Sequence, residues 1–448
     1  MPVRISVIGC GYLGAVHAAC MAELGHDVVG VDVDEAKVAL LSQSKAPFFE
    51  PGLPELLAKV APTGRLRFTT DMSEITGAQV HFVCVGTPQR KGEYAADLRY
   101  VDAAVDALAP YLEGTDEAPA LVVGKSTVPV GTAARLAERV TELVPAGTRA
   151  ILAWNPEFLR EGFAVEDTLT PDRFVYGLPA GGDGAIAKAL LDEVYATPLA
   201  SGTPLVTTDY PTAELVKVAA NSFLATKISF INAMAEVCEK VDADVVSLAD
   251  AIGHDARIGR RFLNAGLGFG GGCLPKDIRA FMARAGELGA DQALTFLREV
   301  DDINMRRRHR MVDLTREVCE GSLLGRRVAV LGAAFKPNSD DIRDSPALNV
   351  AAQLKLQGAH VTVYDPEAMD NARRLWPDLR FGADVAETIE GADAVLVLTE
   401  WDEFVRLDPE TVGKAVRNRR MLDGRNALDP AAWRAAGWTY RALGRPRA

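Results

Sequence analysis

The stretch that decides the fold is Arg4-Ile5-Ser6-Val7-Ile8-Gly9-Cys10-Gly11-Tyr12-Leu13-Gly14. Its first five residues form a short, largely apolar run that predicts a β-strand, and three closely spaced glycines follow. A helical pattern, Tyr12 to Leu24, begins inside the glycine turn, and Asp27 to Val31 is a second predicted strand. A strand, a tight turn, a helix and a second strand indicate the βαβ unit of a parallel sheet.

The glycine turn also matches a dinucleotide-binding fingerprint, because Gly9, Gly11 and Gly14 have the Gly-x-Gly-x-x-Gly spacing and Asp32 ends the next strand. Gly9 permits the turn, Gly11 lets a pyrophosphate approach, and Gly14 lets helix and strand pack, while the helix N-terminus faces the phosphates. Asp32 would accept hydrogen bonds from ribose hydroxyls and repel a 2′-phosphate, which favours NAD over NADP. The alternative is a tight turn without a ligand.

The rest of the chain repeats this rhythm around a helical middle. Further strands are predicted at residues 80–85, 121–125 and 151–154, and again at 326–332, 361–366 and 394–398. Between them the pattern from Tyr210 to His309 is helical, with one helix running to about Val241. We therefore predict an α/β protein with two Rossmann-like doubly wound domains joined by a long central helix and helical region. The expected boundaries are 1–205, 206–310 for a central helical dimerisation domain, and 311–448.

Composition sets broad limits on function. The chain has 448 residues, 48% hydrophobic and 25% charged, with a net charge of −12; this is typical of a soluble globular protein and argues against binding nucleic acid or anionic membrane. The basic run at residues 306–310 is interpreted as a solvated helix face. The start of the chain is too short an apolar run for a signal peptide, and the best membrane candidate, residues 215–237, carries charges.

The six cysteines are scattered, so we expect no disulfide framework or metal site, and a reducing cytoplasm. Cys10 and Cys20 are interpreted as packing groups. Cys273 differs, because it lies in the glycine-rich loop Gly268-Phe269-Gly270-Gly271-Gly272-Cys273-Leu274-Pro275-Lys276-Asp277. Glycines let backbone approach a ligand closely, and a thiol held there can reach it too. A nicotinamide site together with a reactive thiol suggests an oxidation through a covalent thiohemiacetal.

Polar side chains follow two predicted strands of the first domain, at the sheet edge where ligands bind in open α/β sheets. Thr87 comes after the strand that ends near Val85, and Ser126 and Thr127 come after the strand that ends near Lys125. These hydroxyls are placed to contact cofactor or substrate. Ordinary capping of helices is the alternative for each residue.

Two pairs of candidate residues have helical spacing. Glu157 and Glu161 are four apart, so one turn of helix would put both on one face, where adjacent carboxylates suit proton handling; a solvated helix start is the alternative. Lys217 and Asn221 are four apart on the long helix, where a half-buried lysine can stabilise an oxyanion. The alternative is a lysine whose apolar stem packs against the core while its ammonium reaches solvent.

Three polar segments follow strands of the second α/β domain: Phe335-Lys336-Pro337, residues 340–346 and Asp423-Gly424-Arg425-Asn426. Lysine and arginine there fit phosphate or sugar recognition. Alternatively, Arg343 and Asp344 only cap a helix that Pro346 begins. The glycine fingerprint of this domain is degraded, since Gly332 is followed by Ala333-Ala334-Phe335-Lys336, and we expect a nucleotide-shaped domain that does not hold a dinucleotide.

Together these segments resemble the UDP-glucose/GDP-mannose dehydrogenase family of nucleotide-sugar 6-dehydrogenases, and most closely its UDP-glucose branch. The resemblance covers nearly the whole chain. Besides the fingerprint, it rests on Lys125-Ser126-Thr127-Val128-Pro129-Val130-Gly131, residues 155–162, Asn221-Ser222-Phe223, Arg257-Ile258-Gly259, Phe262-Leu263-Asn264, the Cys273 loop, residues 335–346 and Thr399-Glu400-Trp401.

The resemblance implies a four-electron oxidation, in which UDP-glucose, two NAD and water give UDP-glucuronate and two NADH. It makes Cys273 the nucleophile, Lys217 the residue that stabilises oxyanions, Asn221 its partner, and Asp277 the aspartate that works with an ordered water. The remaining polar groups of the active site would be Thr127, Glu157 and Glu161. Which group takes the first alcohol proton stays open.

The resemblance also implies the binding residues. Cofactor contacts would come from Gly9, Gly11, Tyr12, Leu13, Gly14, Asp32, Lys37, Gly86, Thr87, Ser126, Thr127, Glu161, Lys276 and Arg343. Contacts to the UDP-sugar would come from Glu157, Phe158, Leu159, Arg160, Glu161, Lys217, Asn221, Arg257, Phe262, Gly270, Lys336 and Arg425. Arg257 would reach the neighbouring subunit's substrate site, which implies a functional homodimer. Gly272 departs from the family pattern, where serine or tyrosine often precedes the cysteine, but a small residue there fits.

The nearest alternative is the same chemistry on GDP-mannose or a UDP-N-acetylhexosamine, since the Cys273 loop is also similar in GDP-mannose dehydrogenases. A two-electron hydroxyacid dehydrogenase would share the first domain but have no use for Cys273. A non-catalytic nucleotide-sugar sensor would require the loss of a nucleophile, base or cofactor site, and those residues are all present.

Overall fold

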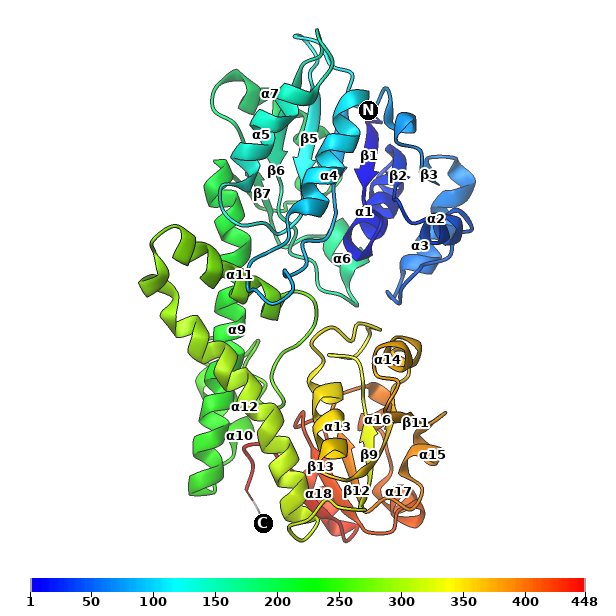
Figure 1. Cartoon of the computed structure of the whole chain (residues 1–448), viewed down its shortest axis with the longest axis vertical. Helices are drawn as coiled ribbons and strands as arrows, with labels where there is room; N and C mark the ends of the chain where they lie inside the picture. The colour runs from blue at the N-terminus through cyan, green and yellow to red at the C-terminus, as the bar shows by residue number, and fades with distance from the viewer. Residues whose placement is uncertain (1, 447–448) are drawn as a thin grey trace. The chain divides into compact units, whose positions relative to one another are not determined.

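The computed structural model describes residues 2–446 and separates into two compact units, each built on one β-sheet (Figure 1). The first unit comprises residues up to Ala220 together with Arg279–Leu288, and the second comprises Asn221–Ile278 and residues from Gly289 onward. Two helices contribute residues to both units: α9 (Tyr210–Val241) and α11 (Leu274–Glu287).

The first unit contains eight strands and eight complete α-helices. The strands are β1 (Arg4–Ile8), β2 (Asp27–Val31), β3 (Leu66–Thr69), β4 (Val80–Val83), β5 (Ala120–Gly124), β6 (Ala150–Trp154), β7 (Phe174–Gly177) and β8 (Leu205–Thr208). The helices are α1 (Tyr12–Glu23), α2 (Glu35–Ser42), α3 (Leu53–Val60), α4 (Arg99–Leu108), α5 (Thr132–Leu143), α6 (Ala164–Leu169), α7 (Gly182–Val194) and α8 (Ala196–Ala200), with 3₁₀ turns at Ala61–Thr63, Met72–Ile75 and Ala109–Tyr111.

The strands of the first unit are ordered β3-β2-β1-β4-β5-β6-β7-β8. All neighbours are parallel except β6 and β7, which pair antiparallel through Trp154 and Gly177. The chain leaves β1 toward one sheet edge and returns to the other side of it at β4, so the strand order reverses between them. Ligands of open α/β sheets bind at such a reversal, beyond the carboxyl ends of the strands.

Alternating strand residues build a core on each face of this sheet. Ile5 and Val7 of β1 join one core with α1, α3 and α7, whereas Ile8 joins the opposite core with α4 and α5. Successive strand side chains point to opposite faces, so a strand that is apolar at nearly every position buries both. This explains the continuous apolar runs in β1, β4 and β5 and confirms the predicted doubly wound sheet.

The second unit contains six strands, β9 (Arg327–Leu331), β10 (His360–Tyr364), β11 (Arg380–Phe381), β12 (Ala394–Val397), β13 (Arg420–Asp423) and β14 (Thr439–Ala442). Its helices, besides the shared ones, are α10 (Val245–Gly253), α12 (Thr295–Val318), α13 (Pro346–Leu356), α14 (Met369–Leu375), α15 (Val385–Ile389), α16 (Asp402–Val405), α17 (Pro409–Ala415) and α18 (Pro430–Ala435), with a 3₁₀ turn at Asp291–Leu294.

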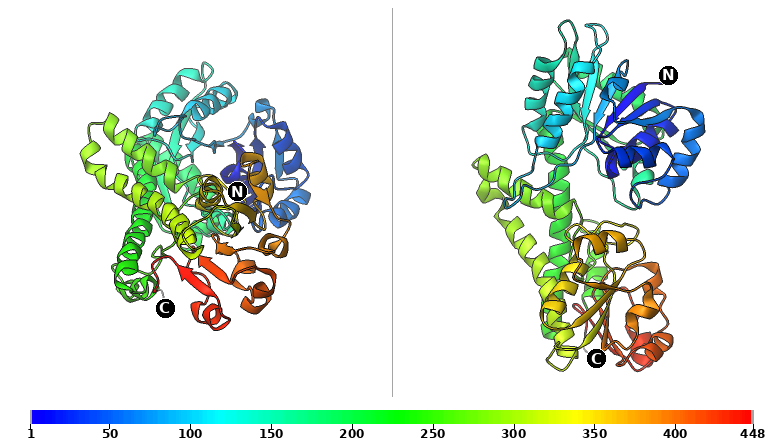
Figure 2. Two further views of the ribbon diagram at one scale, coloured as in Figure 1. Left: turned by 60° about the horizontal axis from the view of Figure 1, so that its bottom comes forward. Right: turned by 45° about the vertical axis from the view of Figure 1, so that its right-hand side comes forward.

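The strands of the second unit are all parallel and ordered β11-β10-β9-β12-β13-β14. This is again the doubly wound order, so both predicted Rossmann-like sheets are confirmed. A separate apolar cluster, formed by Ile231, Ala235, Val245, Ala249 and Leu263, joins α9 to α10 and to the segment that follows it. Figure 2 shows α9 and α12 from two further directions, in green and yellow-green.

The prediction of a helical turn at residues 155–162 is wrong. This segment is irregular from Asn155 to Arg160 and then turns, and the next helix, α6, begins only at Ala164. Buried Glu50, more than one hundred residues earlier, accepts hydrogen bonds from Gly162 N–H and Ala164 N–H, both at 2.8 Å. A distant carboxylate therefore supplies the hydrogen bonds that an earlier helical start would have formed within the segment.

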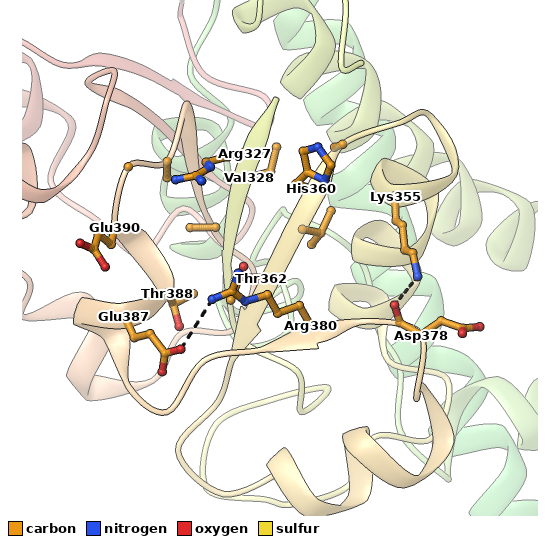
Figure 3. Close-up of a pocket in the computed structure, with 15 residues that line it drawn as sticks. Arg327, Val328, Lys355, His360, Thr362, Asp378, Arg380, Glu387, Thr388 and Glu390 are labelled. Atoms are coloured by element: carbon orange, nitrogen blue, oxygen red, sulfur yellow. Dashed lines mark hydrogen bonds and ion pairs between the residues drawn. The ribbon is translucent and has the colours of Figure 1, made fainter. Parts of the chain in front are cut away.

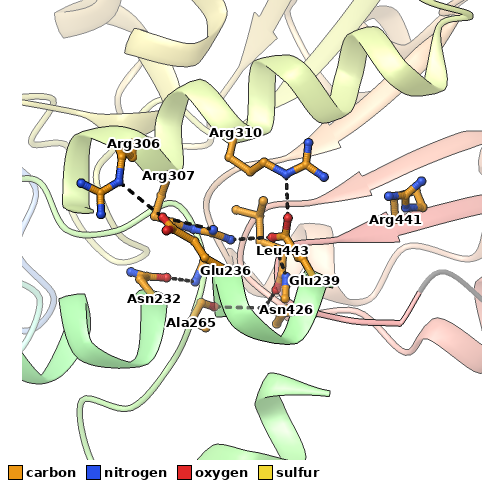
Figure 4. Close-up of polar contacts among 12 residues, drawn as sticks. Asn232, Glu236, Glu239, Ala265, Arg306, Arg307, Arg310, Asn426, Arg441 and Leu443 are labelled. Atoms are coloured by element: carbon orange, nitrogen blue, oxygen red, sulfur yellow. Dashed lines mark hydrogen bonds and ion pairs between the residues drawn. The ribbon is translucent and has the colours of Figure 1, made fainter. Parts of the chain in front are cut away.

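The prediction that the basic run is a solvated helix face holds for Arg306 and His309, which are exposed, but is wrong for the residues between them. It lies in α12, but Arg307 is fully buried and Arg308 is 1% exposed. Arg307 Nη2 lies 2.9 Å from Glu239 of α9, and Arg310 Nε lies 2.6 Å from the same carboxylate (Figure 4). Burial alone would raise the pKa of Glu239, but the two guanidinium groups lower it overall. Buried charges persist only when they are paired.

Candidate active site

The glycine turn after β1 has the shape that a dinucleotide pyrophosphate needs. Gly9 has φ of +90°, a conformation that residues with a Cβ rarely adopt, and a Cβ on Gly14 would lie 1.7 Å from the Gly9 carbonyl oxygen. A Cβ on Gly11 would meet nothing within 4 Å. No side chain caps the N-terminus of α1 and no acid lies in its first turn. Its first N–H groups can therefore bind an anion.

Asp32, at the end of β2, is 7% exposed and faces this turn. Its Oδ2 accepts a hydrogen bond from Cys10 N–H at 2.7 Å and lies 2.9 Å from Lys37 Nζ, while Oδ1 accepts from Asp34 N–H at 3.0 Å. The carboxylate is thus held against the turn, with both lone pairs of Oδ2 occupied, while Oδ1 keeps acceptor capacity. Burial raises the pKa of the Cys10 thiol, which agrees with its interpretation as a packing group.

The corresponding acid of the second unit, Asp365, is fully buried and its acceptor sites are occupied. It accepts hydrogen bonds from five donors, namely the N–H groups of Ala333, Ala334, Glu367 and Ala368 and Trp401 Nε1. A carboxylate offers about four lone-pair sites, so Asp365 has none left for a ribose. This contrast with Asp32 supports the prediction that the second unit does not hold a dinucleotide.

The hydroxyls that follow β4 and β5 connect the two loops to each other. Thr87 Oγ1 donates to the Thr127 carbonyl at 2.7 Å, and Ser126 Oγ donates to the Val85 carbonyl at 2.6 Å. Thr87 and Ser126 are buried, whereas Gly86 is exposed and Thr127 is partly exposed. The structure therefore brings these two segments together at the carboxyl end of the sheet.

Lys217 and Glu157 meet within the first unit. Lys217 Nζ lies 3.0 Å from Glu157 Oε1, Glu157 Oε2 accepts a hydrogen bond from Leu159 N–H at 2.6 Å, and the Phe158 ring centroid lies 5.6 Å from the ammonium. Both charged side chains are largely buried, where electrostatic interactions are stronger than in water. The lysine is therefore buried in an ion pair, and the alternative of a charge extended to solvent is wrong.

Other residues of this segment lie apart from that pair. The Arg160 guanidinium is exposed and bound to Asp167 at 2.6 Å, which leaves its backbone as the group that could contact a ligand. Glu161 is partly exposed in the turn.

Asn221, one helical turn after Lys217 on α9, belongs to a second polar group that lies in the second unit. Its Nδ2 donates to Asp277 Oδ2 at 2.6 Å, and Asp277 Oδ1 lies 2.6 Å from Lys276 Nζ. Asp277 is 2% exposed and its N–H donates to the Cys273 carbonyl at 2.9 Å in the first turn of α11. The predicted residues Asn221, Lys276 and Asp277 are thus in direct contact.

The loop before Cys273 is tightly enclosed by its own unit. A Cβ on Gly270 would lie 2.4 Å from the Asp344 carbonyl oxygen, one on Gly271 would lie 2.8 Å from the Phe335 ring, and one on Gly272 would lie 2.2 Å from the Arg343 guanidinium. The glycines are therefore required by packing. The Cys273 side chain is exposed, whereas the other five cysteines are buried.

The predicted basic residues of the second unit surround this loop. Arg343 binds Asp341 through Nε and Nη2, both at 2.8 Å. Arg425 donates to the carbonyls of Leu398, Gly268 and Phe335 at 2.8 to 3.0 Å. Lys336 Nζ lies 5.5 Å from the centroid of the Phe335 ring.

Neither Arg343 nor Asp344 caps α13, as the alternative required, because Ser345 is its N-cap and accepts from Leu348 N–H. Two further predicted residues are exposed: Arg257, bound to Asp255, and Phe262, whose φ is +66°.

Sequence reasoning missed two buried acids that hold this framework. Glu50 fixes the turn at Gly162, and Glu214 of α9 accepts hydrogen bonds from Gly131 N–H at 2.8 Å and Ala133 N–H at 2.7 Å, which caps α5. In each case the partners lie 80 or more residues away, so no local pattern could reveal them.

A cavity of about 830 Å³ lies elsewhere in the second unit, beside the first residues of β9 and β10 (Figure 3). It is opposite to the carboxyl ends of those strands, where ligands of such sheets bind. Its lining mixes cations and acids, including Arg327, Lys355, Arg380, Asp378 and Glu387. Arg380 pairs with Glu387 at 3.8 Å, and Lys355 binds the Asp378 carbonyl. This balance of charge favours neither an anion nor a cation.

Within residues 2–446, no three His, Cys, Asp or Glu side chains are grouped to hold a metal ion. Across the same residues no helix combines the length and the apolar character that crossing a bilayer requires.

Three consecutive domains of one protein family match the chain in order. The NAD binding domain of the UDP-glucose/GDP-mannose dehydrogenase family matches residues 3–198, its central domain residues 211–306, and its UDP binding domain residues 329–430. The chain belongs to this dehydrogenase family. The NAD binding domain contains the fingerprint turn and Asp32, and the UDP binding domain contains Lys336, Arg343 and Arg425, so the predicted resemblance is confirmed.

Two related enzymes and one solved structure match this chain along nearly its full length. The UDP-glucose 6-dehydrogenase of Rhizobium meliloti (strain 1021) is 43% identical over 99% of this chain and 100% of its own, and UDP-glucose 6-dehydrogenase TuaD of Bacillus subtilis (strain 168) is 41% identical over 99% and 93%. The structure of a UDP-glucose dehydrogenase from Pyrobaculum islandicum is 38% identical, with a TM-score of 0.89 over 99% and 98% of the two chains. The predicted fold class and the enzyme class are thus confirmed.

The residues of the NAD binding domain fit the cofactor. The turn offers open space over Gly11 and uncapped N–H groups at the start of α1, which suit a pyrophosphate. Asp32 keeps acceptor capacity for ribose hydroxyls, and it is the residue type expected for NAD. The chain therefore has the hydrogen-bond donors and acceptors that NAD requires.

Proposed function

We propose that this dehydrogenase oxidises C6 of UDP-glucose to a carboxylate, consuming two NAD and one water and forming UDP-glucuronate and two NADH. The observation that carries the proposal is a thiol in a tightly enclosed glycine loop, in a chain that matches all three family domains. Of the six cysteines, all within the described residues, only Cys273 is exposed. The full-length relatives named UDP-glucose 6-dehydrogenase support the choice of sugar.

Cys273 explains how one site carries out two oxidations. The first oxidation removes a hydride and a proton from the C6 alcohol and leaves an aldehyde. The Cys273 thiolate then forms an S–C6 bond, which gives a thiohemiacetal that again carries a transferable hydride. Loss of that hydride and of the hydroxyl proton leaves a thioester, and water breaks the S–C6 bond to release the carboxylate, a proton and the thiol. Sulfur suits both steps because it is a good nucleophile and a good leaving group.

The other predicted polar groups take the roles that such intermediates need. Lys217 stabilises the negative oxygen on C6, and its burial beside Phe158 makes that interaction stronger than it would be in water. Asn221 acts as its partner. Asp277 holds the water that attacks the thioester, and its contacts with Asn221 and Lys276 fix its orientation. Thr127, Glu157 and Glu161 complete the site, and the first alcohol proton goes to one of these groups or to Lys217.

Bound NAD supplies the hydride acceptor for both oxidations. The chain would hold it through the predicted fingerprint residues Gly9 to Gly14 and Asp32, with Lys37, Gly86, Thr87, Ser126, Thr127, Glu161, Lys276 and Arg343. UDP-glucose would be bound by residues 157–161, Lys217, Asn221, Arg257, Phe262, Gly270, Lys336 and Arg425. We place the domain boundaries at 1–205, 206–310 and 311–448.

We also propose a homodimer in which Arg257 contributes to the partner's substrate site. An apolar row supports a helical interface, because Phe223, Phe230, Val237 and Val241 are all exposed along α9 and are spaced seven or four residues apart. Arg257 is 88% exposed at its side chain. Gel filtration of a Phe230→Glu variant tests this interface, and an unchanged dimer would contradict it.

The chemistry further supports a cytoplasmic location, because it requires a reduced Cys273 thiol, which a reducing compartment maintains. Fractionation of cells with an antibody against the chain tests this directly. Recovery outside the cytoplasm would contradict it.

The test of function is the NADH formed per sugar nucleotide consumed, with UDP-glucose, GDP-mannose and UDP-N-acetylglucosamine measured in parallel. We expect two NADH per UDP-glucose and little from the others. One NADH per sugar would contradict the thioester route, whereas two NADH from a different sugar nucleotide would keep the route and change the substrate.

A further inference from the structure

Helix α12 carries several buried polar side chains, and two of them, Asn304 and Arg308, lie four residues apart and therefore share one face of the helix. Asn304 is 0% exposed and Arg308 is 1% exposed. Burying an amide or a guanidinium is costly unless its polar atoms find partners. Both side chains find partners in the segment that leads to Cys273.

Asn304 binds both main-chain groups of Phe269, four residues before Cys273. Phe269 N–H donates to Asn304 Oδ1 at 2.7 Å, and Asn304 Nδ2 donates to the Phe269 carbonyl at 2.9 Å. This approach depends on Gly268, because a Cβ at that position would lie 2.0 Å from Asn304 Oδ1. The Asn304 amide thus holds both the N–H and the carbonyl of Phe269, at the start of the glycine loop.

Arg308 joins the same point to a second loop. Its Nη2 donates to the carbonyls of Phe269 and Asp344, both at 3.3 Å, and its Nη1 lies 2.8 Å from Asp344 Oδ1. The second loop in turn contacts the glycine loop, since Gly271 N–H donates to the Arg343 carbonyl at 2.8 Å. The glycine loop is therefore held between α12 and residues 343–344.

We propose that Asn304 and Arg308, which we name the Phe269 clamp, are positioning residues for Cys273. Neither is assigned to substrate or cofactor; they act through the Phe269 backbone to keep the Cys273 loop in one conformation, ready for attack on the aldehyde. The inference rests on the proposed function in one respect, the role of Cys273 as the nucleophile.

A positioning role predicts a selective effect on the reaction. Covalent attack requires the reacting atoms to be held about 3 to 3.5 Å apart, and a misplacement of about 1 Å can cost about a hundredfold in rate. The first hydride transfer does not use the thiolate, but formation of the thiohemiacetal does. Loosening the Phe269 clamp should therefore slow the second NADH far more than the first.

The experiment is a single turnover of the full-length enzyme, in excess over UDP-glucose and with saturating NAD, followed by NADH absorbance. The first variant, Asn304→Asp, keeps the acceptor for Phe269 N–H but loses the donor to the Phe269 carbonyl. The second, Arg308→Lys, keeps the positive charge but loses the guanidinium that contacts Phe269 and Asp344 at once. Arg307→Lys is the matched control, because Arg307 is the adjacent buried arginine but binds Glu239 of α9 instead of the loop (Figure 4).

We expect both clamp variants to form the first NADH at nearly the wild-type rate and the second about a hundredfold more slowly, while Arg307→Lys changes both phases alike. Equal slowing of both phases in the clamp variants, or no change, would overturn the inference.

If the wild type yields only one NADH, the proposed function fails instead, and the Phe269 clamp is then judged by alkylation of Cys273 with iodoacetamide. Faster alkylation in both clamp variants than in Arg307→Lys supports it, and equal rates overturn it.

Discussion

Replacing Lys125, the buried residue that directly follows β5, with Met measures the free-energy cost of burying a charged side chain in the first unit. Lys125 Nζ donates to Asn155 Oδ1 at 2.9 Å and to Tyr195 Oη at 3.3 Å, and it lies 5.8 Å from the centroid of the Phe82 ring. Burial lowers the pKa of this lysine from its usual 10.5 to about 8. Tyr195 Oη also donates to Asn155 Oδ1 at 2.9 Å, so Lys125→Met leaves that acceptor with a partner.

The sign of the pH effect follows from proton binding. Between pH 8 and 10.5 the unfolded chain keeps the Lys125 proton while the folded chain has lost it, so the free energy of unfolding rises with pH. A change from 10.5 to about 8, at about 1.4 kcal/mol for each tenfold change, amounts to about 3 kcal/mol in total. About 2 kcal/mol of this should accrue between about pH 7 and about pH 9.5.

Urea unfolding of the wild type and of Lys125→Met at these two pH values provides the assay. The wild type should gain about 2 kcal/mol relative to the variant at the higher pH. Lys59→Met is the control, because Lys59 is 68% exposed and its removal should leave no such difference. If the difference in the free energy of unfolding between wild type and Lys125→Met is the same at both pH values, burial does not lower the pKa of Lys125 and the reasoning is refuted.

Three further predictions concern the site and its supports. Gly14→Ala should abolish NAD binding in a fluorescence titration, because the new Cβ would lie 1.7 Å from the Gly9 carbonyl oxygen; unchanged affinity would contradict the fingerprint. Glu214→Ala should destabilise the chain to urea by about 2 kcal/mol, since it removes the cap of α5 and takes the acceptor from Gly131 N–H and from the buried Ala133 N–H, whereas a loss below about 0.5 kcal/mol would contradict that role. Cys273→Ser should lose the second NADH per UDP-glucose, and retention of both would rule out the thioester.

The elements of the fold were predictable because their signals are local. β1 and β2 fall at Arg4–Ile8 and Asp27–Val31, as predicted, and α9 ends at Val241. Apolar strands, glycine turns and helix starts are encoded within a few neighbouring residues. The family was predictable for a related reason, since its motifs are short and occur in a fixed order along the chain.

The site was predicted only as a set of residue types. The sequence placed Lys217 and Glu157 among the candidates but did not indicate the 3.0 Å ion pair between them, and it suggested a helix where residues 155–160 are irregular. The roles of Cys273 and its neighbours in the reaction stay predictions.

By itself the sequence determined two doubly wound sheets, a long helix, a dinucleotide turn and a cysteine that lies in a glycine-rich loop instead of an apolar strand or helix. Only the tertiary structure decided which charges are buried and what holds them: Arg308 binds the Phe269 backbone, Glu214 caps a helix 80 residues earlier, and Asp365 has its acceptor sites occupied while Asp32 does not. The physical reason is that backbone conformation responds to adjacent residues, whereas the burial and pairing of a polar group depend on segments that meet only when the chain packs.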